Sequence, residues 1–154
     1  MKPKQLFSLF ATAEAITWTL LISALIARVV APEQAILVTI AGGIHGAVFL
    51  GYAVTAVLVG LNQRWKFSRL SIAVLLAIVP FATVPFELRL KKADALDGAW
   101  RTTKSSDPRD GFWIDGLFRW FIARPLILLA VLLILIPVIF ATLLWLGPPD
   151  QWFD

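Results

Sequence analysis

Four long apolar segments alternate with polar stretches along the chain, at residues 6–30, 35–61, 70–86 and 125–146. A helix needs about 20 apolar residues to cross a hydrocarbon core of about 30 Å, and only the third segment lies at the short end of that range. Because lipid offers the backbone no hydrogen bonds, uncharged runs of this length form helices. The pattern predicts an all-α, polytopic membrane helix bundle with four transmembrane helices, forming a single domain over residues 1–154.

The chain between the third and fourth predicted spans has a different pattern. Residues 87–111 form a polar loop rich in charged side chains, in which SSDPRDG predicts turns. Residues 112–124, FWIDGLFRWFIAR, place apolar side chains around most of a helix and leave Asp115 and Arg119, four residues apart, on a narrow polar face. This predicts a short interfacial helix at the level of the lipid headgroups. The alternative is a fourth span that protrudes from the membrane.

Composition agrees with a membrane protein, since 59% of the residues are hydrophobic and only 16% are charged, against about 25% charged in a soluble domain. The absence of cysteine excludes disulfides and zinc–thiolate sites. A single histidine argues against a multi-ligand metal site, so we expect no metal. The net charge is +4, and the basic residues flank apolar segments. We therefore expect them to bind anionic lipid headgroups rather than nucleic acid.

The first apolar segment also bears on the orientation of the chain. It is longer than the apolar region of a cleaved signal peptide, about 7–15 residues, so we expect a retained helix. The short basic stretch NQRWKFSR, residues 62–69, favours a cytoplasmic N-terminus and, with four spans, both termini in the cytoplasm. The cations of the polar loop favour the opposite orientation.

Two lone polar residues lie inside the first two apolar segments. Glu14 lies about 12 Å from the start of its segment and His45, the only histidine, about 15 Å from the start of the next. Because these helices are expected to be antiparallel neighbours, the two side chains reach similar depths. A carboxylate at the bilayer centre costs about 2.5–3.5 kcal/mol. We therefore expect a buried polar pair, in which a hydrogen bond between Glu14 and His45 satisfies both groups.

Neighbouring residues support this pair. The same helix faces carry possible partners or packing side chains for it, namely Thr17, Trp18, Phe49 and Tyr52. Small side chains at close helical spacing predict helix packing through Gly42, Gly46, Ala47 and Gly51.

Two further residue types have predicted roles. Prolines remove backbone N–H groups, and we expect helix kinks, with carbonyls freed for His45 or Tyr52, at Pro80, Pro85 and Pro137. Tryptophans near segment ends predict membrane-interface anchors at Trp65, Trp113, Trp120 and Trp145.

The stretches ATAEAITWTLL, GGIHGAVFLGY, NQRWKFSR and VPFATVPFELRL, in this order, resemble a family of small bacterial integral membrane proteins that is defined as a domain of unknown function. The similarity covers about residues 5–92 and includes the motifs E-x-x-x-W and H-G-x-x-F. Members of the family typically have three predicted spans, so the polar loop and the span at 125–146 are additions in this chain. The family positions that match are Glu14, Trp18, His45, Gly46, Phe49 and Pro80. The resemblance implies a bacterial inner-membrane location and no particular activity.

The sequence contains no catalytic motif that we identify, so an enzyme is not the leading hypothesis. We expect a non-enzymatic accessory, assembly or interaction subunit that binds another membrane protein or a second copy of itself. The first alternative is a proton-coupled carrier or channel component that uses Glu14 and His45. The second is a haem-binding or catalytic membrane protein that uses His45, since one axial histidine suffices for haem.

Overall fold

The computed structural model describes residues 1–146, apart from the side chains of Gln34 and Leu144, and it is helical with no β-strand in this range. The predicted all-α fold is confirmed. The α-helices are α1 (Pro3–Val30), α2 (Ala35–Asn62), α3 (Phe67–Leu75), α4 (Thr83–Lys92), α5 (Trp113–Ile122) and α6 (Pro125–Leu146). Three short 3-10 helices connect them, η1 (Pro32–Gln34), η2 (Leu76–Ile78) and η3 (Pro108–Gly111).

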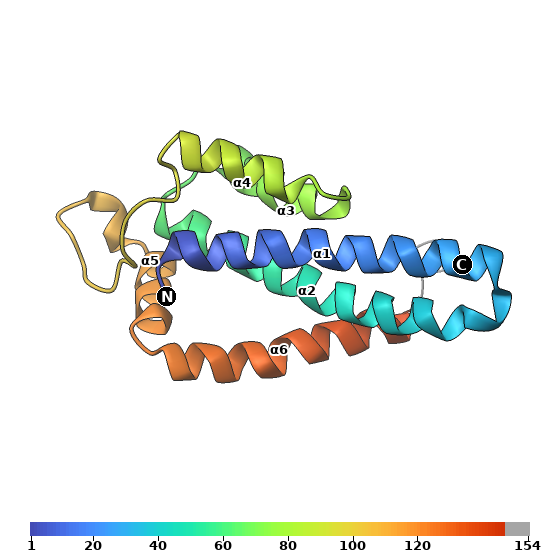
Figure 1. The fold of residues 1–154 in the computed structure, drawn as a ribbon. Helices are drawn as coiled ribbons and strands as arrows, with labels where there is room; N and C mark the ends of the chain where they lie inside the picture. Colours follow the sequence, from blue (N-terminus) through green and yellow to red (C-terminus); the bar gives the residue numbers. More distant parts are fainter. Residues whose placement is uncertain (147–154) are drawn as a thin grey trace.

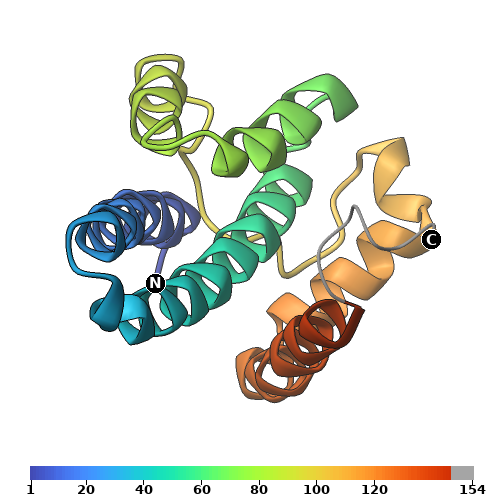
Figure 2. The ribbon, with the colours of Figure 1, turned by 90° about the vertical axis from the view of Figure 1, so that its right-hand side faces the viewer.

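Three of the described helices are long and apolar enough to cross a membrane: α1, α2 and, over Pro125–Leu143, α6. Helices α1 and α2 form an antiparallel pair joined by the short turn around Pro32, and they make the most extensive contact in the molecule (Figure 1). Helix α6 and the pair α3–α4 lie on different sides of α2 (Figure 2). The α1–α2 pair is therefore the scaffold on which the other elements pack.

The prediction of a spanning helix over residues 70–86 is wrong. This segment forms α3 and η2, reverses direction, and returns as α4. Figure 1 shows both short helices beside the same half of α1, so the segment enters the bundle and leaves it again at the same end. The four-span prediction is thereby replaced by three long helices and one helical hairpin. Residues 87–92, predicted as loop, belong to α4.

The reversal has a local cause in the two prolines. Pro80 disfavours the helical conformation at the preceding residue, and Val79 is extended, with φ −98° and ψ 120°. Phe81 then adopts a left-handed conformation, with φ 64°, and the chain turns. Pro85 lies in the first turn of α4, where its missing N–H leaves no helix hydrogen bond unmade. Neither proline kinks a spanning helix as predicted, whereas Pro137 lies inside α6.

Side chains bind the hairpin to α1. The indole N–H of Trp18 donates to the carbonyl of Ala77 (3.2 Å), and the hydroxyl of Thr83 donates to the carbonyl of Ala11 (3.1 Å). Interrupted helices are tolerated at membrane depth only where protein or water satisfies the freed backbone groups. Trp18 supplies such a partner at the point where the helix of the hairpin ends.

A cluster of charged side chains connects the end of α2 to α5. Asp110, which is 2% exposed, accepts hydrogen bonds from Arg64 (2.7 Å) and Arg101 (2.9 Å), and it pairs with Arg119 (3.2 Å). Hydrogen bonds from Ser105 and the neighbouring guanidinium of Arg64 hold the pKa of Asp110 well below its usual range. Sharing one carboxylate among three arginines fixes this connection in one arrangement.

Arg101 also closes the C-terminal end of α2. Its guanidinium donates to the carbonyls of Leu61 (2.7 Å) and Asn62 (2.9 Å), groups that have no partner within the helix. It pairs in addition with Asp115 of α5 at 2.7 Å. Helix α5 runs across the end of the bundle, roughly perpendicular to α6 (Figure 1). The polar face predicted for this helix, Asp115 and Arg119, therefore binds protein.

We expect cysteine labelling to report the hairpin directly, because the natural chain has no cysteine. Exposed Ser68 lies in the first turn of α3, where the hairpin begins, and exposed Thr103 follows the hairpin. In the single variants Ser68→Cys and Thr103→Cys, a membrane-impermeant maleimide should label both thiols from the same side of sealed vesicles. Labelling from opposite sides would show that residues 70–86 span the membrane.

Replacing Gly51 should destabilise the α1–α2 pair, because a Cβ atom there would overlap the ring of Phe10. We expect Gly51→Ala to cost about 1–3 kcal/mol, as overpacked sites do. Gly43→Ala, on the same helix with nothing within 4 Å of its added Cβ, is the matched control and should be neutral or stabilising by up to about 1 kcal/mol. Thermal unfolding in detergent compares them, and equal effects of the two changes would contradict the close approach.

Candidate functional site

Glu14 and His45 meet in the interior of the α1–α2 pair. Glu14 lies in the middle of α1 and is fully buried, and His45 lies on α2 with 9% exposure. The Nδ1 atom of His45 is 3.9 Å from Oε2 of Glu14, an ion-pair distance if the ring is protonated. This is too long for the direct hydrogen bond predicted from the sequence. The two side chains are neighbours without being bonded.

Thr17 takes the hydrogen-bond position at His45. Its hydroxyl lies 3.1 Å from Nδ1 of the ring and 3.1 Å from the carbonyl oxygen of Glu14, one turn earlier. The ring of Trp18 packs against the imidazole at an interplanar angle of 53°, with ring centroids 4.4 Å apart, and the ring of Phe49 lies at 6.4 Å. These three predicted neighbours therefore enclose the imidazole and fix its orientation.

The carboxylate of Glu14 has no hydrogen-bond partner on either oxygen among the described residues. The hydroxyl of Tyr52, also fully buried, has none either. A buried polar group without a partner costs about 1–3 kcal/mol, and more when it is charged. A proton on Glu14 removes the charge and supplies an O–H donor next to His45. The arrangement can therefore hold a proton between two nearby titratable groups.

Further polar residues continue from this pair toward the N-terminal end of α1. Glu87 of α4 is 4% exposed, accepts a hydrogen bond from Ser8 of α1 and pairs with Lys91. Sequence analysis missed both Ser8 and Glu87 because it placed residue 87 in a loop. The sequence did contain a signal for Glu87. Pro85 marks the start of a short helix rather than the end of a long one, and Glu87 follows it by two residues within that helix.

The predicted packing residues have different environments. A Cβ atom at Gly46 would overlap the ring of Phe140 on α6, and Gly51 is similarly close to Phe10. Gly42 approaches Leu21 at 4.0 Å, whereas Ala47 is exposed. The small-residue face is thus occupied by side chains of the chain itself.

The predicted interface tryptophans also divide into two groups. Trp65 is a core residue, since it packs edge-on against Phe7 at 5.8 Å and its indole donates to the carbonyl of Ala95 at 3.0 Å. Trp113 and Trp145 are 75% and 84% exposed, and Trp120 is 43% exposed. The position of Trp65 in a short connection between packed helices explains why it faces inward.

Among residues 1–146, no group of three or more His, Cys, Asp or Glu side chains is arranged to hold a metal ion. His45 lines neither of the two apolar cavities between the long helices. The site is thus a pair of titratable side chains surrounded by aromatic rings.

Two comparisons found known proteins that are similar to this chain. Residues 4–92 match a family described as a domain of unknown function, DUF3817. A protein of Streptomyces coelicolor described as a membrane protein is 34% identical over 91 residues, which cover 58% of this chain and 11% of the relative. The chain thus corresponds to a small part of that relative's length. No solved structure matches the chain.

The matched residues contain α1, α2 and the hairpin, including Glu14 and His45, whereas α5 and α6 lie outside the match. The chain is a membrane protein that belongs to the DUF3817 family.

Proposed function

We propose that this protein is a non-enzymatic accessory subunit that binds a larger membrane protein. The observation that supports this function best is the size of the Streptomyces relative, in which the matched segment makes up 11% of a much longer chain described as a membrane protein. There the family segment is joined covalently to a larger chain. In the sequence of this protein the same segment is followed by α5 and α6.

The shallow groove between α1 and α2, near their connecting turn, is the surface that fits such a partner. Small side chains at its centre, among them Ser23, Ala24 and Ala27, let another helix approach closely, and aliphatic side chains flank them. The glycine face predicted for this role is filled by Phe10 and Phe140. We therefore assign the binding of the partner to the groove instead of the glycine face.

We expect a photo-crosslinking amino acid at exposed Ser23 to capture one membrane protein of defined mass in native membranes. The same substitution at Leu25, which is 43% exposed on another face of α1, is the matched control and should capture only lipid. Mass spectrometry of the captured species identifies the partner, or a second copy of the chain. Equal capture at both positions, or none at Ser23, argues against an accessory subunit that binds through this groove.

The arrangement of charge supports a bacterial inner-membrane orientation with the N-terminus in the cytoplasm. Because the hairpin returns to its starting side, every Lys and Arg except Arg28 belongs to the end of the bundle that holds the N-terminus. Cytoplasmic segments near spanning helices carry the excess of Lys and Arg. The polar loop and the basic stretch NQRWKFSR, which gave opposing signals with four spans, now favour the same orientation, and α6 ends on the other side.

Single cysteines test this orientation. Exposed Glu33 lies in the turn between α1 and α2, at the other end of the bundle from Thr103. In intact spheroplasts we expect an impermeant maleimide to label Glu33→Cys, and Thr103→Cys only after permeabilisation. The reverse pattern would place the N-terminus outside.

A second candidate function is proton transfer linked to the partner's activity, with Glu14 and His45 as the titrating pair. Its support is a carboxylate that is fully buried, has no hydrogen-bond partner and lies 3.9 Å from the only histidine. Ionisable side chains inside the membrane commonly mark proton relays. A purely structural pair would be expected to form the hydrogen bond that is missing here.

We expect Glu14→Gln to lower proton uptake into liposomes containing the protein at least tenfold, because an amide cannot carry the proton. A pH-sensitive dye inside the liposomes measures the flux under a fixed membrane potential. Thr19→Val, on the same helix at an exposed position, should leave it unchanged. If Glu14→Gln only lowers the unfolding temperature while flux persists, the pair is structural.

Haem ligation by His45 stays a prediction. Absorbance of the purified protein near the haem Soret band tests it.

A further inference from the structure

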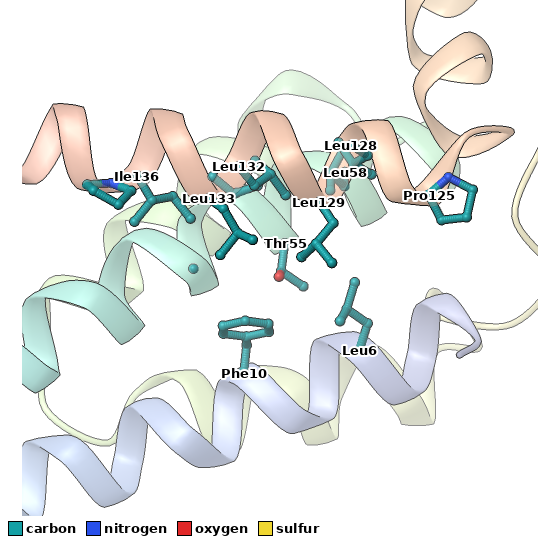
Figure 3. A pocket seen from close by; sticks show the side chains of 13 residues that line it. Leu6, Phe10, Thr55, Leu58, Pro125, Leu128, Leu129, Leu132, Leu133 and Ile136 are labelled. Atoms are coloured by element: carbon teal, nitrogen blue, oxygen red, sulfur yellow. The ribbon is translucent and has the colours of Figure 1, made fainter.

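An apolar cavity opens between α6 and the α1–α2 pair (Figure 3). Helix α6 lies on the side of α2 away from the hairpin (Figure 2). The volume of the cavity is about 400 Å³. Leu6 and Phe10 of α1 face Leu129 and Leu133 of α6 across it, and Thr55 is the only polar side chain of the lining. A space of this kind in a membrane takes an apolar occupant.

The cavity exists because α6 is held near its two ends. At one end, α5 is fixed by the pairs Arg101–Asp115 and Arg119–Asp110, and α6 starts two residues after α5. Further along, Phe140 fills the space left by Gly46. Between these points the leucines of α6 do not reach α1. The gap is therefore a feature of how the helix is attached.

The size of the cavity decides between a second helix and a lipid chain. Its α6 wall runs from Pro125 to Pro137, about 18 Å at 1.5 Å per residue. A helix 10 Å wide and 18 Å long occupies about 1,400 Å³, several times the cavity volume of about 400 Å³. The same 18 Å is close to half of a hydrocarbon core of about 30 Å. A single acyl chain from one leaflet fits in both width and length.

Charge at the mouth of the cavity indicates the headgroup. The mouth lies at the N-terminal end of α1, where Leu6 and Pro125 line it. Arg124 directly precedes Pro125. It forms no ion pair among residues 1–146, and its guanidinium lies over the ring of Trp120 at 4.7 Å, at the level where aromatic side chains meet headgroups. This cation complements an anionic phosphate.

We propose that the cavity between α1, α2 and α6 binds one anionic glycerophospholipid, with an acyl chain between Phe10 and Leu133 and its phosphate near Arg124. The lipid would complete the contact between the family segment and α6. This binding site is independent of the partner surface between α1 and α2 and of the orientation of the chain.

Native mass spectrometry of the full chain in mild detergent tests the site. We expect one retained phospholipid per chain, with anionic lipid preferred when anionic and zwitterionic lipids are supplied equally. Leu132→Trp, which fills the cavity, should lower retention at least tenfold. Leu135→Trp, exposed and outside the lining, is the matched control and should retain the lipid. Arg124→Gln should remove the preference for anionic lipid.

Crosslinking of the unmodified chain keeps the proposal testable if Leu132→Trp does not fold. In vesicles containing a trace of anionic phospholipid with a diazirine in its acyl chain, we expect labelling to concentrate on the cavity walls, at residues 6–10 and 128–136. Labelling spread evenly over the outer faces of all three long helices would overturn the proposal. So would equal lipid retention by Leu132→Trp and Leu135→Trp, or a second copy of the chain crosslinked into the cavity.

Discussion

The hydrocarbon core of a membrane contains no water, so the protein itself must satisfy every backbone N–H and C=O group there. The structure depends on this requirement. Helices α1 and α2 meet this requirement alone, and the interrupted hairpin meets it only by binding α1. Across that interface, the side chain of Trp18 donates a hydrogen bond to the backbone carbonyl of Ala77, and the side chain of Thr83 donates one to the backbone carbonyl of Ala11. The hairpin could not leave α1 without exposing the carbonyl of Ala77 to lipid.

The same interface shapes the polar site. The indole N–H of Trp18 donates to the hairpin and its ring packs against His45, so one side chain serves both the fold and the site. The imidazole is further fixed by Thr17. Glu14 is left without such a partner although it is fully buried. The protein thus orients the histidine and leaves the carboxylate available for a proton.

Much of the fold could be predicted from the pattern of apolar residues, because long uncharged runs in lipid have only one backbone solution. The all-α fold and the proximity of Glu14 and His45 follow from that pattern and from helical rise. The hairpin could not be recognised by hydropathy, since a chain that enters and returns is as apolar as one that crosses. Its signals were Pro80 and Pro85, which we interpreted as kinks. The charged cluster at Asp110 depends on contacts between distant residues, which spacing does not encode.

The attachment of α6 has a consequence for how the protein responds to its bilayer. The helix has 22 residues, a length of about 33 Å, while bilayers differ by several ångströms around a mean thickness of about 30 Å. A thinner bilayer forces a helix of fixed length to lean further over. Because the start of α6 is held by the α5 cluster and Phe140 packs against Gly46, we expect a change of tilt to act on the stretch between these contacts, where the leucines of α6 face Phe10. In that case membrane thickness is coupled to the width of a space inside the protein.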